Sequence, residues 1–378
     1  MKIHYWSPFF SNIATIQAVV RSANSLIEYG KNINYEVSII NAIGEWDEYK
    51  DIINKKINII NLNKFNFLKI IPKGGYLKSR FSYILIFFLS FFKLKRLIQN
   101  DKPDYLIIHL ITSLPIFLSI FQQKTKIILR ISGLPKINFI RKIFWKLFSR
   151  KIYKVTCPTK ATYDYLKESK IFSDDKLLIL KDPIIDMKKF LIFSKSKVDE
   201  KFSNKKIITG IGRLTKQKNF ELLIRFFKNI EKDFPEFILI ILGEGEEKEK
   251  LQKLINSLNI QKKAFLLGYE KNVYKFLLNS QYFILTSLWE DPGFVLVEAA
   301  ISNSTIISSN CPNGPYEIIK NDNFLFCNND KNDLLQKFIN LEKNTSKNSI
   351  FSQKTDVKKR VKDFTKFNHY KNLIKILI

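Results

Sequence analysis

Short apolar runs alternate along the chain with longer segments in which apolar residues recur at helical spacing. In the first half the runs are KIHYW, EVSII, INIIN, DYLIIHL, KIILRIS and KVTCP, and segments such as 13–29 and 140–148 have the helical pattern. The runs are almost continuously hydrophobic, which is typical of strands buried on both faces of a parallel sheet. The first half is therefore predicted to be a doubly wound α/β domain.

A second series of apolar runs follows a polar, Lys-rich stretch at 194–206. These runs are KIITGIG, FILIILG, AFLLG, YFILT, TIISS and FLFC. We predict an α/β protein of two Rossmann-like domains, residues 1–187 and 188–362, with a helix at 363–378 that packs back on the first domain. Ligands of such folds bind at the carboxyl ends of the strands, so we expect the site in a cleft between the domains.

The first strand of the second domain ends in GIGRLTKQKNF. Gly210 and Gly212 allow a tight turn, and Arg213 and Lys218 follow it before the next helix. A guanidinium and an ammonium held there suit a diphosphate. The alternative is a pair of solvated cations, which are common in so basic a chain.

The next strand, FILIIL, runs into GEGEE, with Gly243 and Gly245 after the strand. The third glycine of a dinucleotide fingerprint is missing, and Glu246 and Glu247 precede the helix. Acidic residues are stabilised at a helix start, so we interpret this turn as structural.

The stretch WEDPGFVLVEAA follows the strand YFILT and carries two acids, Glu290 and Glu298. We expect Glu290 in the loop, placed for hydroxyls beyond a bound phosphate, and Glu298 one helical turn on, placed for ribose hydroxyls. A helix that starts at Gly293 would present the amides of Phe294 and Val295 to a pyrophosphate. The alternatives are two acids without a common ligand, or a hydrolase-type carboxylate pair, which we consider the weaker idea.

The order GRL-x3-K, LGEG, S-x2-E-x-PGF-x3-E resembles the second domain of the retaining GT-B glycosyltransferases of family 4 (glycosyltransferase group 1), of the bacterial surface-polysaccharide type. The resemblance covers the whole chain in layout and residues 207–341 in motif detail. It implies a GT-B fold and transfer of a sugar from a nucleotide donor with retention. It also implies that Arg213 and Lys218 hold the donor diphosphate, that Glu290 contacts the donor sugar, and that Glu298 contacts the ribose. The donor phosphate site would be completed by Gly293, Phe294 and Val295.

The first domain matches this family less closely. SPFFSNIAT stands where members have a glycine-rich loop, so Asn12, beside Ser11, is the candidate to present an amide to the donor phosphate. Ser132 lies roughly where many members have a histidine. His109, at the end of DYLIIHL, is a further catalytic candidate, and the alternative is a buried core histidine.

Composition indicates in which cellular compartment the protein is expected and whether a metal or cofactor is expected. Three cysteines without paired spacing, Cys157, Cys311 and Cys327, argue against a disulfide framework and for a reducing compartment. The start of the chain reads as a strand rather than a signal peptide, so we expect a cytoplasmic protein. The three histidines are scattered and no D-x-D triplet occurs, so we predict no metal, and no cofactor beyond the nucleotide-sugar substrate.

The chain holds 63 Lys and Arg against 35 Asp and Glu, a net charge of +28. The segment 124–154 has ten basic residues and no acid, interleaved with aromatic residues, and the segment upstream that ends in FSYILIFF has a similar character. The apolar run 81–92 is too short to span a membrane. We therefore expect peripheral binding to an anionic membrane at its inner face, with core helices and solvated lysines as the alternative. No nucleic-acid module appears, so we expect no nucleic-acid partner.

Together these patterns predict a metal-independent, retaining hexosyltransferase that uses a UDP-sugar and a lipid-linked oligosaccharide or surface-glycan acceptor. The alternatives are a sugar-nucleotide epimerase or a phosphorylase on the same fold, and a non-enzymatic basic protein that binds membrane or nucleic acid.

Overall fold

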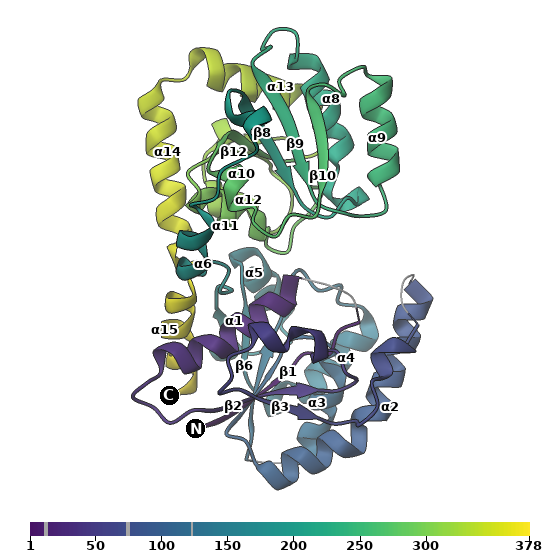
Figure 1. Cartoon of the computed structure of the whole chain (residues 1–378). Coiled ribbons are helices and arrows are strands. Elements are labelled where there is room, and N and C mark those ends of the chain that lie inside the picture. The colour runs from purple at the N-terminus through teal and green to yellow at the C-terminus, as the bar shows by residue number, and fades with distance from the viewer. Residues whose placement is uncertain (11–13, 73–75, 122–123) are drawn as a thin grey trace. The chain divides into compact units, whose positions relative to one another are not determined.

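The computed structural model describes residues 1–10, 14–72, 76–121 and 124–378, and it divides into two compact units (Figure 1). Unit 1 comprises Met1–Ile184 and Lys366–Ile378, and unit 2 comprises Ile185–Thr365. Each division lies three residues from the domain boundary expected from the sequence, at 184 rather than 187 and at 365 rather than 362. Unit 1 is thus built from two segments that the whole of unit 2 separates in the sequence.

The described strands of unit 1 form a 7-stranded parallel sheet in the order β3-β2-β1-β4-β5-β6-β7. The strands are β1 (Lys2–Trp6), β2 (Glu36–Asn41), β3 (Asn58–Asn61), β4 (Tyr105–Ile108), β5 (Lys126–Arg130), β6 (Ile152–Cys157) and β7 (Leu177–Ile179). The edge strand β7 is absent from the sequence prediction. Its three apolar residues follow a charged turn and are too few to give a periodic signal.

Helices cover both faces of this sheet: α1 (Ala14–Tyr29), α2 (Tyr76–Asp101), α3 (Ser113–Leu118), α4 (Phe139–Phe148), α5 (Lys160–Glu168) and α15 (Lys366–Leu377). Successive strand residues point to opposite faces. Leu106 and Ile108 of β4 therefore enter a core shared with α2, α3, α4 and α5. Ile107 enters the other core, shared with α1 and α15.

Helix α15 is fixed to unit 1 by buried polar contacts as well as by its apolar face. Lys366 Nζ lies 2.8 Å from Glu28 Oε2 of α1. His369 is 3% exposed, and its Nδ1–H donates to the Lys181 carbonyl at 2.7 Å, so its Nε2 accepts from Ser22 Oγ at 2.8 Å. The structure thus places the helix expected at 363–378 on the first domain.

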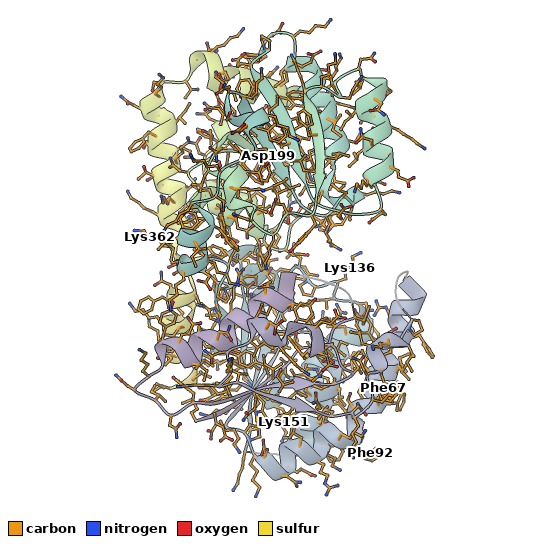
Figure 2. The ribbon with its side chains drawn as sticks, viewed as in Figure 1. Phe67, Phe92, Lys136, Lys151, Asp199 and Lys362 are labelled. Carbon is orange, nitrogen blue, oxygen red and sulfur yellow. The ribbon has the colours of Figure 1, made fainter. Side chains whose placement is uncertain are left out.

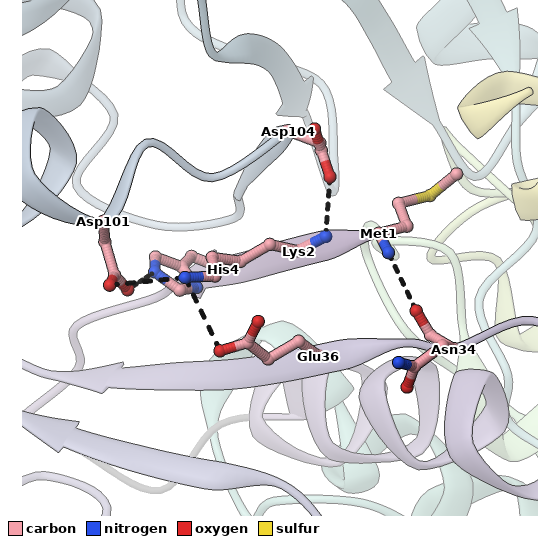
Figure 3. Close-up of polar contacts among 7 residues, drawn as sticks. All are labelled: Met1, Lys2, His4, Asn34, Glu36, Asp101 and Asp104. Carbon is pink, nitrogen blue, oxygen red and sulfur yellow. Dashed lines mark hydrogen bonds and ion pairs between the residues drawn. The ribbon is translucent and has the colours of Figure 1, made fainter.

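The amino-terminal edge of β1 carries a cluster of polar contacts (Figure 3). His4 Nε2–H donates to Asp101 Oδ2 at 2.7 Å, and Lys2 Nζ lies 3.4 Å from Asp101 Oδ1 and 3.5 Å from Glu36 Oε1. The Lys2 amide donates to Asp104 Oδ2 at 2.7 Å. These contacts tie the end of α2 to the sheet edge opposite the carboxyl ends of the strands.

The described strands of unit 2 form a 6-stranded parallel sheet in the order β10-β9-β8-β11-β12-β13. The strands are β8 (Lys206–Ile211), β9 (Phe237–Leu242), β10 (Ala264–Gly268), β11 (Ser280–Leu285), β12 (Thr305–Ser309) and β13 (Leu325–Phe326). The helices are α6 (Met187–Phe193), α7 (Glu200–Ser203), α8 (Phe220–Ile230), α9 (Lys248–Ser257), α10 (Tyr274–Leu277), α11 (Phe294–Ile301), α12 (Pro315–Ile319), α13 (Lys331–Ile339) and α14 (Lys347–Arg360). Every residue of β9 is buried, as its continuous hydrophobicity predicts.

The strand order reverses between β8 and β11, because the chain builds β9 and β10 on one side of β8 and then returns to its other side. In open α/β sheets the crevice at such a point, beyond the carboxyl ends of the strands, is where ligands bind. In unit 1 the same reversal falls between β1 and β4. None of the helices in the described ranges has the length and apolarity needed to cross a membrane.

Candidate active site

The loop after β8 carries Lys218 back over the end of its own strand. A side chain on Gly212 would place its Cβ 3.1 Å from both Cδ and Cε of Lys218, so the glycine leaves room for the lysine stem. The Lys218 ammonium then points to the neighbouring loop after β11, where it meets Glu290. The sequence motif therefore has a local steric reason for its second glycine.

The GEG turn after β9 packs closely against the same loop. A Cβ on Gly243 would lie 1.8 Å from the Gly212 carbonyl oxygen, and one on Gly245 would lie 2.3 Å from the Leu214 carbonyl oxygen. The Leu214 amide donates to the Glu244 carbonyl at 2.9 Å. Both glycines are required for this backbone contact, which gives the turn a structural reason, and the expectation that it binds no phosphate stays a prediction.

Glu290 is the centre of the site in unit 2. It is 4% exposed, and its Oε1 accepts from Lys218 Nζ and from Ser287 Oγ, each at 2.5 Å. Ser287 is fully buried, and its own carbonyl accepts from Ser309 Oγ at 2.6 Å. Both side-chain donors reach Oε1, and within the described ranges no donor reaches Oε2. The second carboxylate oxygen is thus left for another partner.

Three further bonds join the loop after β8 to the loop after β11. The Leu288 amide donates to the Gln217 carbonyl at 2.8 Å, and Gln217 Nε2 donates to the Trp289 carbonyl at 2.9 Å. Thr286 Oγ1 donates to the Lys218 carbonyl at 2.9 Å. Hydrogen bonds therefore connect the two loops on either side of the strand-order reversal.

Helix α11 begins immediately after the loop that follows β11. Gly293 has φ +85°, a left-handed conformation that favours glycine, and its carbonyl accepts from the Leu296 amide at 3.0 Å. The amides of Phe294 and Val295 belong to the first turn, where a helix offers donors without intrahelical acceptors. Glu298 is half-buried one turn further along the same helix. The four residues expected near a phosphate and a ribose thus share one short helix and its cap.

Arg213 differs from Lys218 in its surroundings. Its side chain is exposed, and it forms no hydrogen bond or ion pair with the residues that the structure describes. It follows Gly212 in the same loop, so it can turn toward a ligand at no cost in internal contacts. The structure places it in the same loop as Lys218, and its role at the site stays a prediction.

Cys311 lies beside this site and is missed by reasoning from the sequence. The thiol is 3% exposed, and burial, together with the charge of Glu290, raises its pKa to about 11. It therefore stays protonated at neutral pH and fills space next to the carboxylate. A single cysteine in a polar loop sequence, SSNCPNG, gives no sequence signal of this position.

In unit 1 the candidate His109 lies at the carboxyl end of β4, beside β1. Its amide donates to the Trp6 carbonyl at 2.9 Å, and its side chain is 7% exposed. Its Nδ1 is buried without a partner among the described residues. Burial, together with the charge of Arg130, holds its pKa well below the usual value, so the imidazole is neutral at pH 7. The candidate Asn12 lies outside the described residues.

Among the residues that the structure describes, no three His, Cys, Asp or Glu side chains group as a possible metal site. The predicted absence of a metal from the reaction stays a prediction. None of the three cysteines forms a disulfide, and Cys157 and Cys311 are buried whereas Cys327 is exposed.

Comparison with known proteins finds similarity to glycosyl transferases. Residues 192–358 match the family model described as glycosyl transferases group 1. An uncharacterized glycosyltransferase of Methanocaldococcus jannaschii is 32% identical over 253 residues, which cover 60% of this chain and 61% of that protein. The UDP-Gal:alpha-D-GlcNAc-diphosphoundecaprenol alpha-1,3-galactosyltransferase of Escherichia coli is 28% identical over 192 residues, covering 45% of this chain and 48% of its own. The chain thus spans about three fifths and one half of the lengths of these two relatives.

The fold is shared over the full length with a solved structure. The glycosyltransferase from Rickettsia africae aligns over 100% of this chain and 97% of its own with a TM-score of 0.76, at 16% identity. At that identity the likeness establishes the architecture alone, which is the expected pair of Rossmann-like domains. Residues 192–358 therefore resemble the group 1 glycosyl transferases, and the chain has the GT-B fold.

Proposed function

We propose that this protein moves a sugar from a UDP-sugar donor to a lipid-linked oligosaccharide or surface-glycan acceptor, with retention and without a metal. The observation that carries the proposal is the Lys218–Glu290 pair, which joins two loops at the point where the strand order of unit 2 reverses. A cation and a carboxylate held together there suit the two ends of a sugar diphosphate, its phosphates and its sugar hydroxyls.

Different residues of unit 2 would bind different parts of the nucleotide-sugar donor. Lys218 and the unengaged Arg213 would bind the diphosphate, together with the first amides of α11. The free Oε2 of Glu290 would accept a hydroxyl of the donor sugar. Glu298 would accept the hydroxyls of the ribose.

The same groups would serve the chemical step. As the bond from the sugar to the diphosphate breaks, negative charge grows on the leaving group, and fixed cations and amides stabilise it without a metal. The retaining outcome rests on the family resemblance. His109 is the proposed catalytic residue of unit 1, and burial keeps its imidazole in the neutral form that can accept a proton.

The Escherichia coli relative supports the proposed substrates, since its name gives a UDP-sugar donor and a diphosphoundecaprenol-linked acceptor. An acceptor of that kind lies in a membrane. We therefore place the protein in the cytoplasm as a peripheral protein on the inner face of the cell membrane, with no cofactor and no nucleic-acid partner.

A panel of nucleotides and nucleotide sugars tests this proposal by thermal stabilisation. A ligand that binds only the folded state raises the melting temperature with its concentration, and UDP and one or more UDP-sugars should do so. The stabilising donor is then incubated with a lipid-linked acceptor, and the glycosylated product is measured. Conversion of the donor without acceptor would indicate an epimerase, and dependence on inorganic phosphate a phosphorylase. A protein that no nucleotide stabilises would overturn the donor site.

A further inference from the structure

Helix α2 presents a stripe of large apolar side chains to solvent. Phe81, Ile84, Phe88 and Phe92 are 56%, 56%, 70% and 77% exposed, and their spacing of three and four residues places them on one face. Figure 2 labels Phe92 on this helix. A stripe of this size is unusual on a soluble monomer and marks a surface that contacts something else.

A neighbouring face of α2 already packs in the core. The rings of Phe87 and Phe91 lie 6.3 and 6.1 Å from the ring of Phe117 in α3, which in turn lies 6.2 Å from Phe148 of α4. This aromatic ladder fixes the rotation of α2 and α4 about their axes. The exposed stripe is therefore in addition to the core face and cannot turn inward without breaking the ladder.

Helix α4 repeats the arrangement. Trp145 and Phe148 are buried, whereas Phe139, Ile140 and Leu147 are 77%, 76% and 72% exposed. The helix start is fixed by Asn138, whose side chain accepts from the Arg141 amide at 2.9 Å. Both helices belong to the same core cluster, so their exposed residues lie in the layer on one side of the unit 1 sheet.

The sequence around these helices is strongly basic, and Asp101 and Asp104 lie between the two segments without acids. Residues 62–100 hold 8 Lys or Arg and residues 105–163 hold 11, and neither segment contains Asp or Glu. On α4 the exposed lysines Lys142 and Lys146 alternate with the exposed apolar residues. Apolar side chains among cations, without acids, match the acyl boundary and the phosphates of an anionic bilayer. A protein partner of ordinary composition would leave many of these cations unpaired.

We infer that the exposed faces of α2 and α4 form a docking surface for an anionic lipid bilayer. The phenylalanines and aliphatic side chains enter the interface between headgroups and acyl chains, and the lysines and arginines bind lipid phosphates. The inference deepens the proposed function, because a lipid-linked acceptor would then be met in the plane of the bilayer. It names the helices that hold the protein there.

Vesicle sedimentation tests the docking surface with the full-length protein. Vesicles of phosphatidylcholine with phosphatidylglycerol should sediment the protein, and 1 M salt should release most of it, because the ionic contribution is screened. F88S/F92S should weaken binding by about a hundredfold, since each exposed phenylalanine adds about a factor of ten when buried. F351S is the matched control, because Phe351 on α14 of unit 2 is 68% exposed, and it should bind like the wild type.

A second pair of variants isolates the charge. K142A/K146A should weaken binding to the anionic vesicles by about fivefold for each lysine and should have little effect with phosphatidylcholine alone. K253A, which removes an exposed lysine of α9, is the control. Binding of UDP, measured by calorimetry on each variant, should stay unchanged. A failure of the donor site is therefore distinguishable from a failure of docking.

Three results would overturn the inference. The first is that the wild type does not sediment with anionic vesicles at low salt. The second is that F88S/F92S sediments with them as strongly as F351S does. The third is that the protein binds a single-stranded RNA oligomer with the same variant dependence and ignores vesicles, which would make the surface a nucleic-acid site.

Discussion

Lys218 Nζ lies 2.5 Å from Glu290 Oε1, with the carboxylate 4% exposed and the lysine side chain 13% exposed. The two residues are 72 positions apart, and each belongs to a loop that follows a different strand. A buried carboxylate is stable only while its cation and donors remain. In the proposed mechanism the donor diphosphate competes with Glu290 for the same lysine.

Replacing Lys218 by Met leaves the Glu290 carboxylate without its cation and should lower the free energy of unfolding by about 1–3 kcal/mol. Transfer should be lost as well, because the diphosphate loses a ligand. Calorimetric unfolding measures the first effect, with K216M, an exposed lysine of the same loop, as control. The double variant K218M/E290Q removes both charges and should be less destabilised than the sum of the two single variants. Additive losses would mean that the pair is not coupled.

Replacing Arg213 by Ala should separate binding from stability. The side chain has no partner among the described residues, so the melting temperature should stay within about 1 °C of the wild type. Affinity for the donor should fall about tenfold or more, because a charge-assisted hydrogen bond to phosphate is lost. Calorimetry with UDP measures this. An unchanged affinity would remove Arg213 from the diphosphate site.

Ser287 is expected to be a positioning residue. Its hydroxyl donates to Glu290 Oε1, so S287A should let the carboxylate rotate and should lower kcat about tenfold, with a smaller change in the KM for the donor. S304A is matched to it, because Ser304 is also a buried serine whose hydroxyl is bonded, to the Leu277 carbonyl at 2.6 Å, outside the site. S304A should lose stability and keep kcat. If the two variants behave alike, Ser287 has only a structural role.

Replacing Glu298 by Ala should weaken UDP binding about tenfold, since a carboxylate that accepts two ribose hydroxyls is removed. E249A, which removes an exposed acid of α9, should bind UDP as the wild type does. The pair is compared by calorimetry at one salt concentration. Equal affinities would take Glu298 out of the ribose site and leave the remaining assignments standing.

His369 should make unit 1 less stable in acid. Burial lowers its pKa from 6.5 to about 4, so the unfolded chain binds the extra proton first as pH falls. The stabilising contribution is complete above pH 6.5 and is lost as pH falls toward 4, by about 3 kcal/mol in all. Trp6 and Trp46 are fully buried in unit 1, so denaturation followed by tryptophan fluorescence reports on it.

The wild-type profile is a sum of groups, and a variant isolates His369. Burial raises the pKa of Glu45 to about 7, so that its contribution runs the other way and is lost as pH rises from 4.5 toward 7. H369Q should be less stable than the wild type at pH 7, and the difference between the two should shrink toward pH 5. A difference that stays constant with pH would show that His369 is not buried in its neutral form.

The sequence is sufficient for the described strands other than β7 and for the order of the motifs, because continuous apolar runs and glycine turns are local signals. It predicts the loop positions of Lys218 and Glu290, whereas their pairing depends on how two loops meet after folding. The roles of Ser287 and Cys311 cannot be predicted for the same reason, since a serine and a cysteine in loops after strands look ordinary until the loops are seen to meet. The exposed stripe of α2 also needs the structure, because a run such as FSYILIFFLSFF is apolar on every side and does not say which face the core takes.

Helix α15 imposes an order on how the chain can mature. The first 184 residues leave the ribosome before any of unit 2, yet one side of their core waits for Leu373 and Leu377. Until those residues emerge, α1 presents bare aliphatic surface to solvent, and chaperones recognise such surface. Unit 2 is continuous in sequence and can close without waiting. The last turns of the chain thus complete the domain that was synthesised first, and a protein truncated after residue 365 should aggregate through its amino-terminal half.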